Sequence, residues 1–157
     1  MSRREDRAWR AYRLMQTVLP AQLARDLMRD SGLSEPDYDV LSTLSEKTAH
    51  RWQLREVAAK MSWSRSRLSH HISRMQRRGL VVREDDPDDA RGCMITLTEQ
   101  GLLTLEEAAP AHVQSVRRHF IDLLTHEEIA TLTAIAERVV DRLAAGKAQA
   151  AGASAGS

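Results

Sequence analysis

The chain has 157 residues, a length that fits one domain with a core of moderate size. Its 23 basic and 22 acidic residues leave a formal net charge of only +1, so any basic surface must be local. The single cysteine excludes an intrachain disulfide, no apolar run approaches the ~20 residues that span a bilayer, and the charged N-terminus leads into no signal core.

The spacing of apolar residues predicts a long helix over residues 6–30. Its apolar residues recur at helical spacing: Trp9, Tyr12, Leu14, Met15, Val18, Leu19, Leu23 and Leu27. Pro20 lies inside it, and because proline lacks an amide hydrogen we expect a kink there. Gly32 ends the segment. A second helix is predicted from Ser34, which is spaced from Asp37 as in a capping box, and it continues past Tyr38.

Residues 54–79 predict a helix-turn-helix. A short helix over 54–61 is followed by a tight turn and then by a helix that Ser64 caps and Gly79 ends. One apolar stripe marks the inner face of this last helix: Leu68, Ile72 and Met75. His71 is expected to pack, whereas its neighbour His70 points about 100° away, so the two cannot chelate one metal.

The outer face of the same helix is strongly basic. Between Ser64 and Gly79 the sequence holds five arginines and no acidic residue, whereas a merely solvated face normally mixes both signs. Arginine can fork onto guanine in the major groove of DNA and can pair with phosphate. The candidate DNA-binding residues here are Ser64, Arg65, Ser66, Arg67, Ser69, His70, Ser73, Arg74 and Arg77. We expect Arg67, with Ser66 and His70, to contact a base edge, and Arg74 and Arg77 to contact phosphates.

A β-hairpin, or wing, is predicted after this helix. Residues 80–83 and 94–97 are β-branched or apolar runs, and the segment 84–92 between them is rich in turn formers. The hairpin is acidic, so Arg91 stands out. We expect Arg91 to enter the minor groove of DNA while Asp89 orients its guanidinium group. The alternative is that Arg91 is a loop residue paired with an acid such as Asp86 or Asp88.

At this point the chain resembles the MarR family of bacterial transcription regulators, from about residue 5 to residue 144. The motifs that carry the resemblance are Ser64-x-Ser66-x-Leu68-Ser69, Gly79-Leu80-Val81, Asp86-Pro87-x-Asp89-x-Arg91 and Leu97-Thr98-x-x-Gly101. The chain departs from the family at His71, usually aliphatic, and at Trp63, usually a small aliphatic residue. The resemblance implies an obligate dimer, a palindromic operator and, often, release from DNA when a small phenolic or other ligand binds.

The apolar surface of the flanking helices indicates that the chain forms a dimer. Residues 98–124 and then 125 or 126 to 143 have long helical patterns, and together with the first helix they carry more apolar surface than one small domain needs. A second subunit, related by a twofold axis, would bury that surface. The ends of these helices lead into a low-complexity tail that we expect to be disordered.

The expected fold is mainly α with a small β-hairpin: a winged helix-turn-helix flanked by N- and C-terminal dimerisation helices. The boundaries are 1–33 for the N-terminal dimerisation helix, 34–100 for the DNA-binding region, 101–144 for the C-terminal dimerisation helices and 145–157 for the tail. The expected function is that of a dimeric, sequence-specific transcription regulator, a repressor, in the bacterial cytoplasm and nucleoid. The alternative is a winged-helix protein-interaction module that does not recognise a DNA sequence.

Other residues leave several possibilities open. A small aromatic ligand is expected near Trp9, Tyr12 and Met15 or near Tyr38, although an aromatic stripe on a helix is more often core. Cys93 is either inert or a redox sensor. No cofactor or metal site is predicted, and the chain lacks a glycine-rich phosphate loop, a metal cluster or a nucleophile–base motif, which excludes an enzyme.

Overall fold

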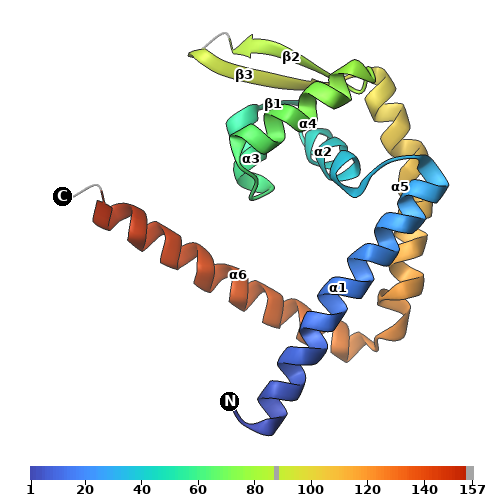
Figure 1. Ribbon diagram of the computed structural model, residues 1–157, viewed down its shortest axis with the longest axis vertical. Helices are drawn as coiled ribbons and strands as arrows, with labels where there is room; N and C mark the ends of the chain where they lie inside the picture. The colour runs from blue at the N-terminus through green and yellow to red at the C-terminus, as the bar shows by residue number, and fades with distance from the viewer. Residues whose placement is uncertain (87–88, 155–157) are drawn as a thin grey trace. The chain divides into compact units, whose positions relative to one another are not determined.

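The computed structural model describes residues 1–86 and 89–154, without the side chains of residues 90–91 and 147–154. It confirms a mostly helical chain with a small antiparallel sheet (Figure 1). The elements are α1 (Arg3–Ser31), α2 (Glu35–Ser45), β1 (Arg51–Gln53), α3 (Leu54–Lys60), α4 (Arg65–Arg77), β2 (Val81–Asp86), β3 (Asp89–Leu97), α5 (Glu99–His119), the 3-10 helix η1 (Ile121–Leu123) and α6 (His126–Ser154).

Local side-chain contacts set the ends of the first helices. Helix α1 continues through Pro20 and ends at Gly32, whose φ of 69° lies in the left-handed region that favours glycine. Helix α2 begins with the predicted capping box, in which the side chains of Ser34 and Asp37 each accept the other's backbone N–H. The sequence therefore determines where α1 stops and where α2 starts.

The sheet has the order β1-β3-β2, with β3 antiparallel to both neighbours. The sequence did not predict strand β1. The two strands of the wing are longer than predicted: β2 extends to Asp86, and β3 begins at Asp89. The segment 84–92, interpreted as a loop from its turn-forming residues, is therefore mostly strand. The backbone ladder between β2 and β3 does not require apolar side chains on both strands, since it pairs Glu84 with Met94 and Asp85 with Cys93.

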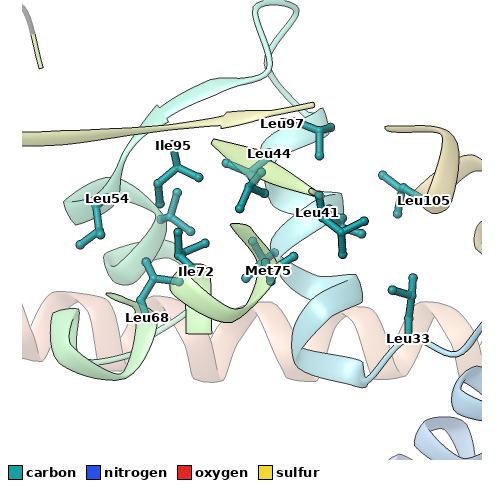
Figure 2. Close-up of a cluster of buried hydrophobic side chains, with 14 of the residues drawn as sticks. Leu33, Leu41, Leu44, Leu54, Leu68, Ile72, Met75, Ile95, Leu97 and Leu105 are labelled. Atoms are coloured by element: carbon teal, nitrogen blue, oxygen red, sulfur yellow. The ribbon is translucent and has the colours of Figure 1, made fainter. Parts of the chain in front are cut away.

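The core lies where α2, α3, α4 and the sheet meet. The predicted stripe of α4 is fully buried, and it packs in one cluster with Leu41 and Leu44 of α2, Val57 of α3 and Ile95 of β3. Figure 2 shows the side chains of Leu41 and Leu44, of the α4 stripe and of Ile95 converging from their different elements. The burial of this stripe directs the opposite face of α4 to solvent.

The exit from the sheet into α5 depends on two residues of the sequence motif at 97–101. The Thr98 hydroxyl donates to the Gly79 carbonyl oxygen at 2.7 Å and accepts from the Gly101 backbone N–H at 2.9 Å. A Cβ on Gly101 would collide with the Leu80 carbonyl oxygen. These contacts tie the end of α4 to the start of α5, which explains why a threonine and a glycine stand at this spacing.

The chain divides into two units, Met1–Ser115 and Val116–Ser157. In the second unit α6 extends to Ser154 and so enters the segment 145–157, whose disorder stays a prediction. The tail is rich in alanine, which has the highest intrinsic helix propensity, and its low complexity concealed that preference. Residues 155–157 lie outside the described part of the chain.

Candidate nucleic-acid interface

Helix α4 presents the predicted basic face to solvent. Ser64 caps the helix, because its Oγ accepts the Arg67 backbone N–H at 3.1 Å. The exposed residues of the face are Ser64, Arg65, Ser66, Arg67, His70, Arg74 and Arg77, and Ser69 and Ser73 are half-buried at its edge. Arginines thus follow the helix along its whole length, and its first turn carries no acid that would repel phosphate.

A groove separates the start of α4 from the wing. It has a volume of about 450 Å³, and its basic lining comes from three different elements: Arg55 of α3, Arg65 of α4 and Arg83 of β2. Arg83 donates from Nη1 to the Ser69 hydroxyl at 3.1 Å and from Nε to the Cys93 sulfur at 3.4 Å. A hydrogen bond from a basic side chain therefore attaches the wing to α4.

Arg55 and Arg83 are not among the DNA-binding residues that the sequence predicts. Arg83 stands in a strand with an exposed residue on either side of it, and Arg55 lies at the start of a short helix. Neither arginine belongs to a run of basic residues. A cluster that forms only when three elements fold together leaves no local pattern. Cys93 lies half-buried in the same groove and is not disulfide-bonded.

The acids on either side of the turn of the wing contact α3 and the residue before it. Asp86 is buried, and its Oδ2 accepts from Gln53 Nε2 at 2.7 Å. Asp89 Oδ2 lies 3.4 Å from Arg55 Nη1. The side chain of Arg91 and all of Asp88 lie outside the described residues, so the pairing of Arg91 with Asp89, or with another acid, stays a prediction.

Below the basic face, His71 is buried, as predicted, and belongs to a polar network between α4 and α2. Its Nδ1 is 2.8 Å from Arg74 Nη2, and its Nε2 is 3.1 Å from Asp37 Oδ1. Asp37 is also buried, and its Oδ2 accepts from Arg78 Nη1 at 2.7 Å. An aliphatic residue at position 71 would offer none of these contacts.

Burial and hydrogen bonding together shift the pKa values of His71 and Asp37, the two groups in the middle of this network. Burial lowers the pKa of His71 below its ordinary value of 6.5; Asp37 opposes this effect, and Arg74 adds to it. Burial alone would raise the pKa of Asp37, but hydrogen bonds from Arg78 and Ser34 outweigh it and lower the pKa. The network therefore holds a neutral imidazole beside an ionised carboxylate.

This arrangement predicts a loss of stability at acid pH. As pH falls below 6.5, the unfolded chain binds a proton at His71 before the folded chain does, so the free energy of unfolding falls until the lowered pKa is reached. Denaturant titrations at several pH values check this. His71→Gln is expected to flatten the dependence in this window, whereas His70→Gln, at the exposed neighbouring position, leaves it in place. An unchanged slope in His71→Gln contradicts the assignment.

The candidate ligand residues lie in two places. Trp9 and Tyr12 pair on the outside of α1 with ring centroids 5.7 Å apart, and Met15 is half-buried one turn further on. Tyr38 lies in the first turn of α2, where its ring is 4.3 Å from that of His112. About 28 Å of helix separates Tyr12 from the end of α1. The four residues therefore do not form one pocket within a chain.

The described part of the chain contains no group of three or more His, Cys, Asp and Glu side chains placed to hold a metal ion. Among the same residues, no helix combines the length and the hydropathy that a membrane crossing requires.

The sequence and the fold of this chain are similar to those of known proteins. The profile of the MarR family matches residues 33–93. The transcriptional regulator HosA of Escherichia coli O111:H- is 30% identical over 119 residues, which cover 76% of this chain and 86% of that protein. The crystal structure of AbsC, a MarR family transcriptional regulator from Streptomyces coelicolor, matches with a TM-score of 0.88 at 39% identity, covering 92% of this chain and 97% of that one.

A second structural relative was solved with DNA. Sco3205, a MarR family transcriptional regulator from Streptomyces coelicolor in complex with DNA, matches with a TM-score of 0.87 at 37% identity and covers 91% of this chain and 93% of its own. The relatives and the fold are those of transcriptional regulators rather than enzymes. With its winged helix and the basic face of α4, the chain belongs to the MarR family of DNA-binding transcriptional regulators.

Proposed function

We propose that the protein is a homodimeric repressor that binds a pseudo-palindromic operator in the bacterial cytoplasm, in association with the nucleoid. The observation that carries this proposal is the exposed face of α4, which holds Arg65, Arg67, Arg74 and Arg77 and no acidic residue. Helix α4 would lie in the major groove, with Arg67 near its N-terminus at a base edge and Arg74 and Arg77 at phosphates. Arg91 of the wing would enter the adjacent minor groove, oriented by Asp89.

Exposed apolar side chains on the terminal helices support the dimer. On α1 the exposed fractions are 52% for Trp9 and 65% for Leu14, and on α6 they are 53% for Val139 and 63% for Leu143. Large apolar side chains repeated along one helix cost free energy in water unless another surface covers them. A second copy, related by a twofold axis, would cover both helices and place the two α4 helices symmetrically.

The dimer predicts the form of the protected DNA. Twofold symmetry places the two copies of α4 in successive major grooves, roughly 34 Å apart. Footprinting on a bound duplex is expected to show two half-sites of inverted sequence protected together. Protection of a single asymmetric half-site by one subunit would show that the protein does not bind DNA in this way.

Release by a small aromatic ligand is the second part of the proposal. A structure with the same fold, the organohalide-sensing regulator RdhR-CbdbA1625, was solved in the 2,4-dichlorophenol bound form, at 18% identity and a TM-score of 0.77. Trp9, Tyr12 and Met15 offer one apolar surface for such a ligand, and Tyr38 beside His112 offers another. A ligand at either place would act by changing the separation of the two α4 helices.

Release by a ligand can be tested, because ligand binding and DNA binding must weaken each other by the same factor. A ligand weakens DNA binding only by the factor by which it prefers the free dimer over the DNA-bound dimer. Phenols and aromatic acids are therefore titrated against the free protein and against the DNA complex, and the releasing compounds are expected to bind the free protein more tightly. Equal affinity in both states would identify the protein as a constitutive DNA binder.

A further inference from the structure

Trp63 lies directly beneath an arginine of the basic face. It occupies the turn between α3 and α4, and it packs against the core cluster from outside. The Arg67 guanidinium carbon is 4.0 Å from the centroid of its ring. The ring of His71 meets the same indole at 5.6 Å and 89°, edge to face. Trp63 thus contacts one exposed and one buried residue of α4, both on the side that faces the turn.

The stacking determines which part of Arg67 stays available. A guanidinium group that lies flat on an aromatic ring uses its face for the cation–π contact, and its N–H donors point outward in the plane of the group. The two N–H groups that fork onto O6 and N7 of a guanine lie in that plane. At 4.0 Å from the ring centroid the Arg67 guanidinium group is within stacking distance of Trp63, and stacking restricts the side chain while it leaves the hydrogen-bonding edge free.

His71 restricts the side chain of Arg74 by a hydrogen bond. Arginine only donates hydrogen bonds, so the Nδ1 atom that faces Arg74 at 2.8 Å must be the acceptor of a neutral imidazole. The proton of that imidazole is then on Nε2, which faces the Asp37 carboxylate at 3.1 Å. Because His71 is only 6% exposed, it cannot reach DNA itself.

We propose that Trp63 and His71 are positioning residues for the DNA-binding face of α4, which hold Arg67 and Arg74 in ordered conformations before DNA arrives. The inference rests on the proposed function, since it requires α4 to bind DNA. A free arginine side chain loses rotamer freedom when it binds, and a contact that restricts it beforehand reduces this loss. Trp63 and His71 thereby have one shared role, each restricting one arginine of the face.

A double-mutant cycle on the full-length dimer tests the first contact. The variants are Trp63→Leu, Arg67→Ala and both together, and the ligand is a duplex selected from a random library by the unmodified protein. Trp63→Leu is expected to weaken binding about two- to fivefold per half-site, as an exposed cation–π contact does. In the Arg67→Ala background the same change is expected to have no further effect, because Trp63 acts through Arg67.

Arg77→Ala is the matched control, since it removes an exposed arginine of the same helix ten positions from Arg67, about 15 Å along the axis. Trp63→Leu is expected to weaken binding in this background by the same factor as in the unmodified protein. An equal loss in the Arg67→Ala background, or no loss in any background, overturns the proposal. If the unmodified protein selects no duplex, or neither arginine matters, the proposed function fails instead.

Trp63→Phe covers the case in which Trp63→Leu does not fold. Phenylalanine keeps a ring under Arg67 but gives a weaker cation–π contact, so a smaller loss is expected, again only when Arg67 is present. The second contact is tested by His71→Asn and His71→Leu. Asparagine Oδ1 can replace Nδ1 as the acceptor for Arg74, so Asn is expected to retain more affinity than Leu, and this difference is expected to vanish in an Arg74→Ala background. A difference that persists without Arg74 shows that His71 has only a structural role.

Discussion

Replacing Arg67 by alanine is expected to weaken binding to the operator by about 1–3 kcal/mol per half-site, an effect that the dimer experiences twice. Arg67 is exposed near the N-terminus of α4, where side chains of a recognition helix reach base edges. A bidentate contact to one base pair is lost, so the preference at that base pair is expected to relax as well. Affinities for the operator and for all single-base variants of it measure both effects.

Arg77→Ala is the control, because its side chain is expected to contact phosphate. Its loss is expected to be the same on every duplex and to lower the slope of log affinity against log salt by about one. Equal losses on operator and random DNA for Arg67→Ala would show that the two roles were assigned wrongly. Arg74 is less suitable as a control, since its bond to His71 makes any change there affect the buried network.

Replacing Ile72 by alanine is expected to lower the free energy of unfolding by about 2–5 kcal/mol. Ile72 is fully buried in the core cluster, between Leu68 and Met75 on the inner face of α4 (Figure 2). The smaller side chain leaves a cavity that the surrounding helices and strand can only partly fill. Equilibrium unfolding in urea measures the change.

The proposed dimer makes the concentration important in this experiment, because unfolding coupled to dissociation depends on it. All variants are therefore compared at one protein concentration. Arg77→Ala is the control, since a change at this exposed position of the same helix is expected to alter stability by less than about 0.5 kcal/mol. A loss for Ile72→Ala no larger than that of Arg77→Ala would mean that the stripe of α4 does not lie in the core.

The features of this fold that local sequence determines could be predicted. Ser34 and Ser64 cap helices, Gly32 ends one, and the spacing of Leu68, Ile72 and Met75 defines the inner face of α4. Each signal depends on residues within two turns of one another. The outer face of α4, which contains most of the candidate site, follows from the inner face by helical geometry.

The features that could not be predicted depend on residues far apart in the chain. Strand β1 has three residues and no pattern of its own, and only its pairing with β3 makes it a strand. Asp37 precedes Arg78 by 41 positions, yet the two share a hydrogen bond below the basic face. Arg83 likewise reaches Ser69 only after the wing has folded against α4. Such contacts are properties of packing, and no periodicity reports them.

Whether α4 recognises a palindromic DNA sequence in the cell is tested by recovering and sequencing the genomic DNA bound to the protein. We expect a shared pseudo-palindrome whose half-site centres lie about 10–10.5 base pairs apart, or a multiple of that spacing. We also expect Arg67→Ala to reduce recovery of these sites relative to bulk DNA. Recovered fragments with no common sequence, and no difference between the protein and Arg67→Ala, would contradict these expectations.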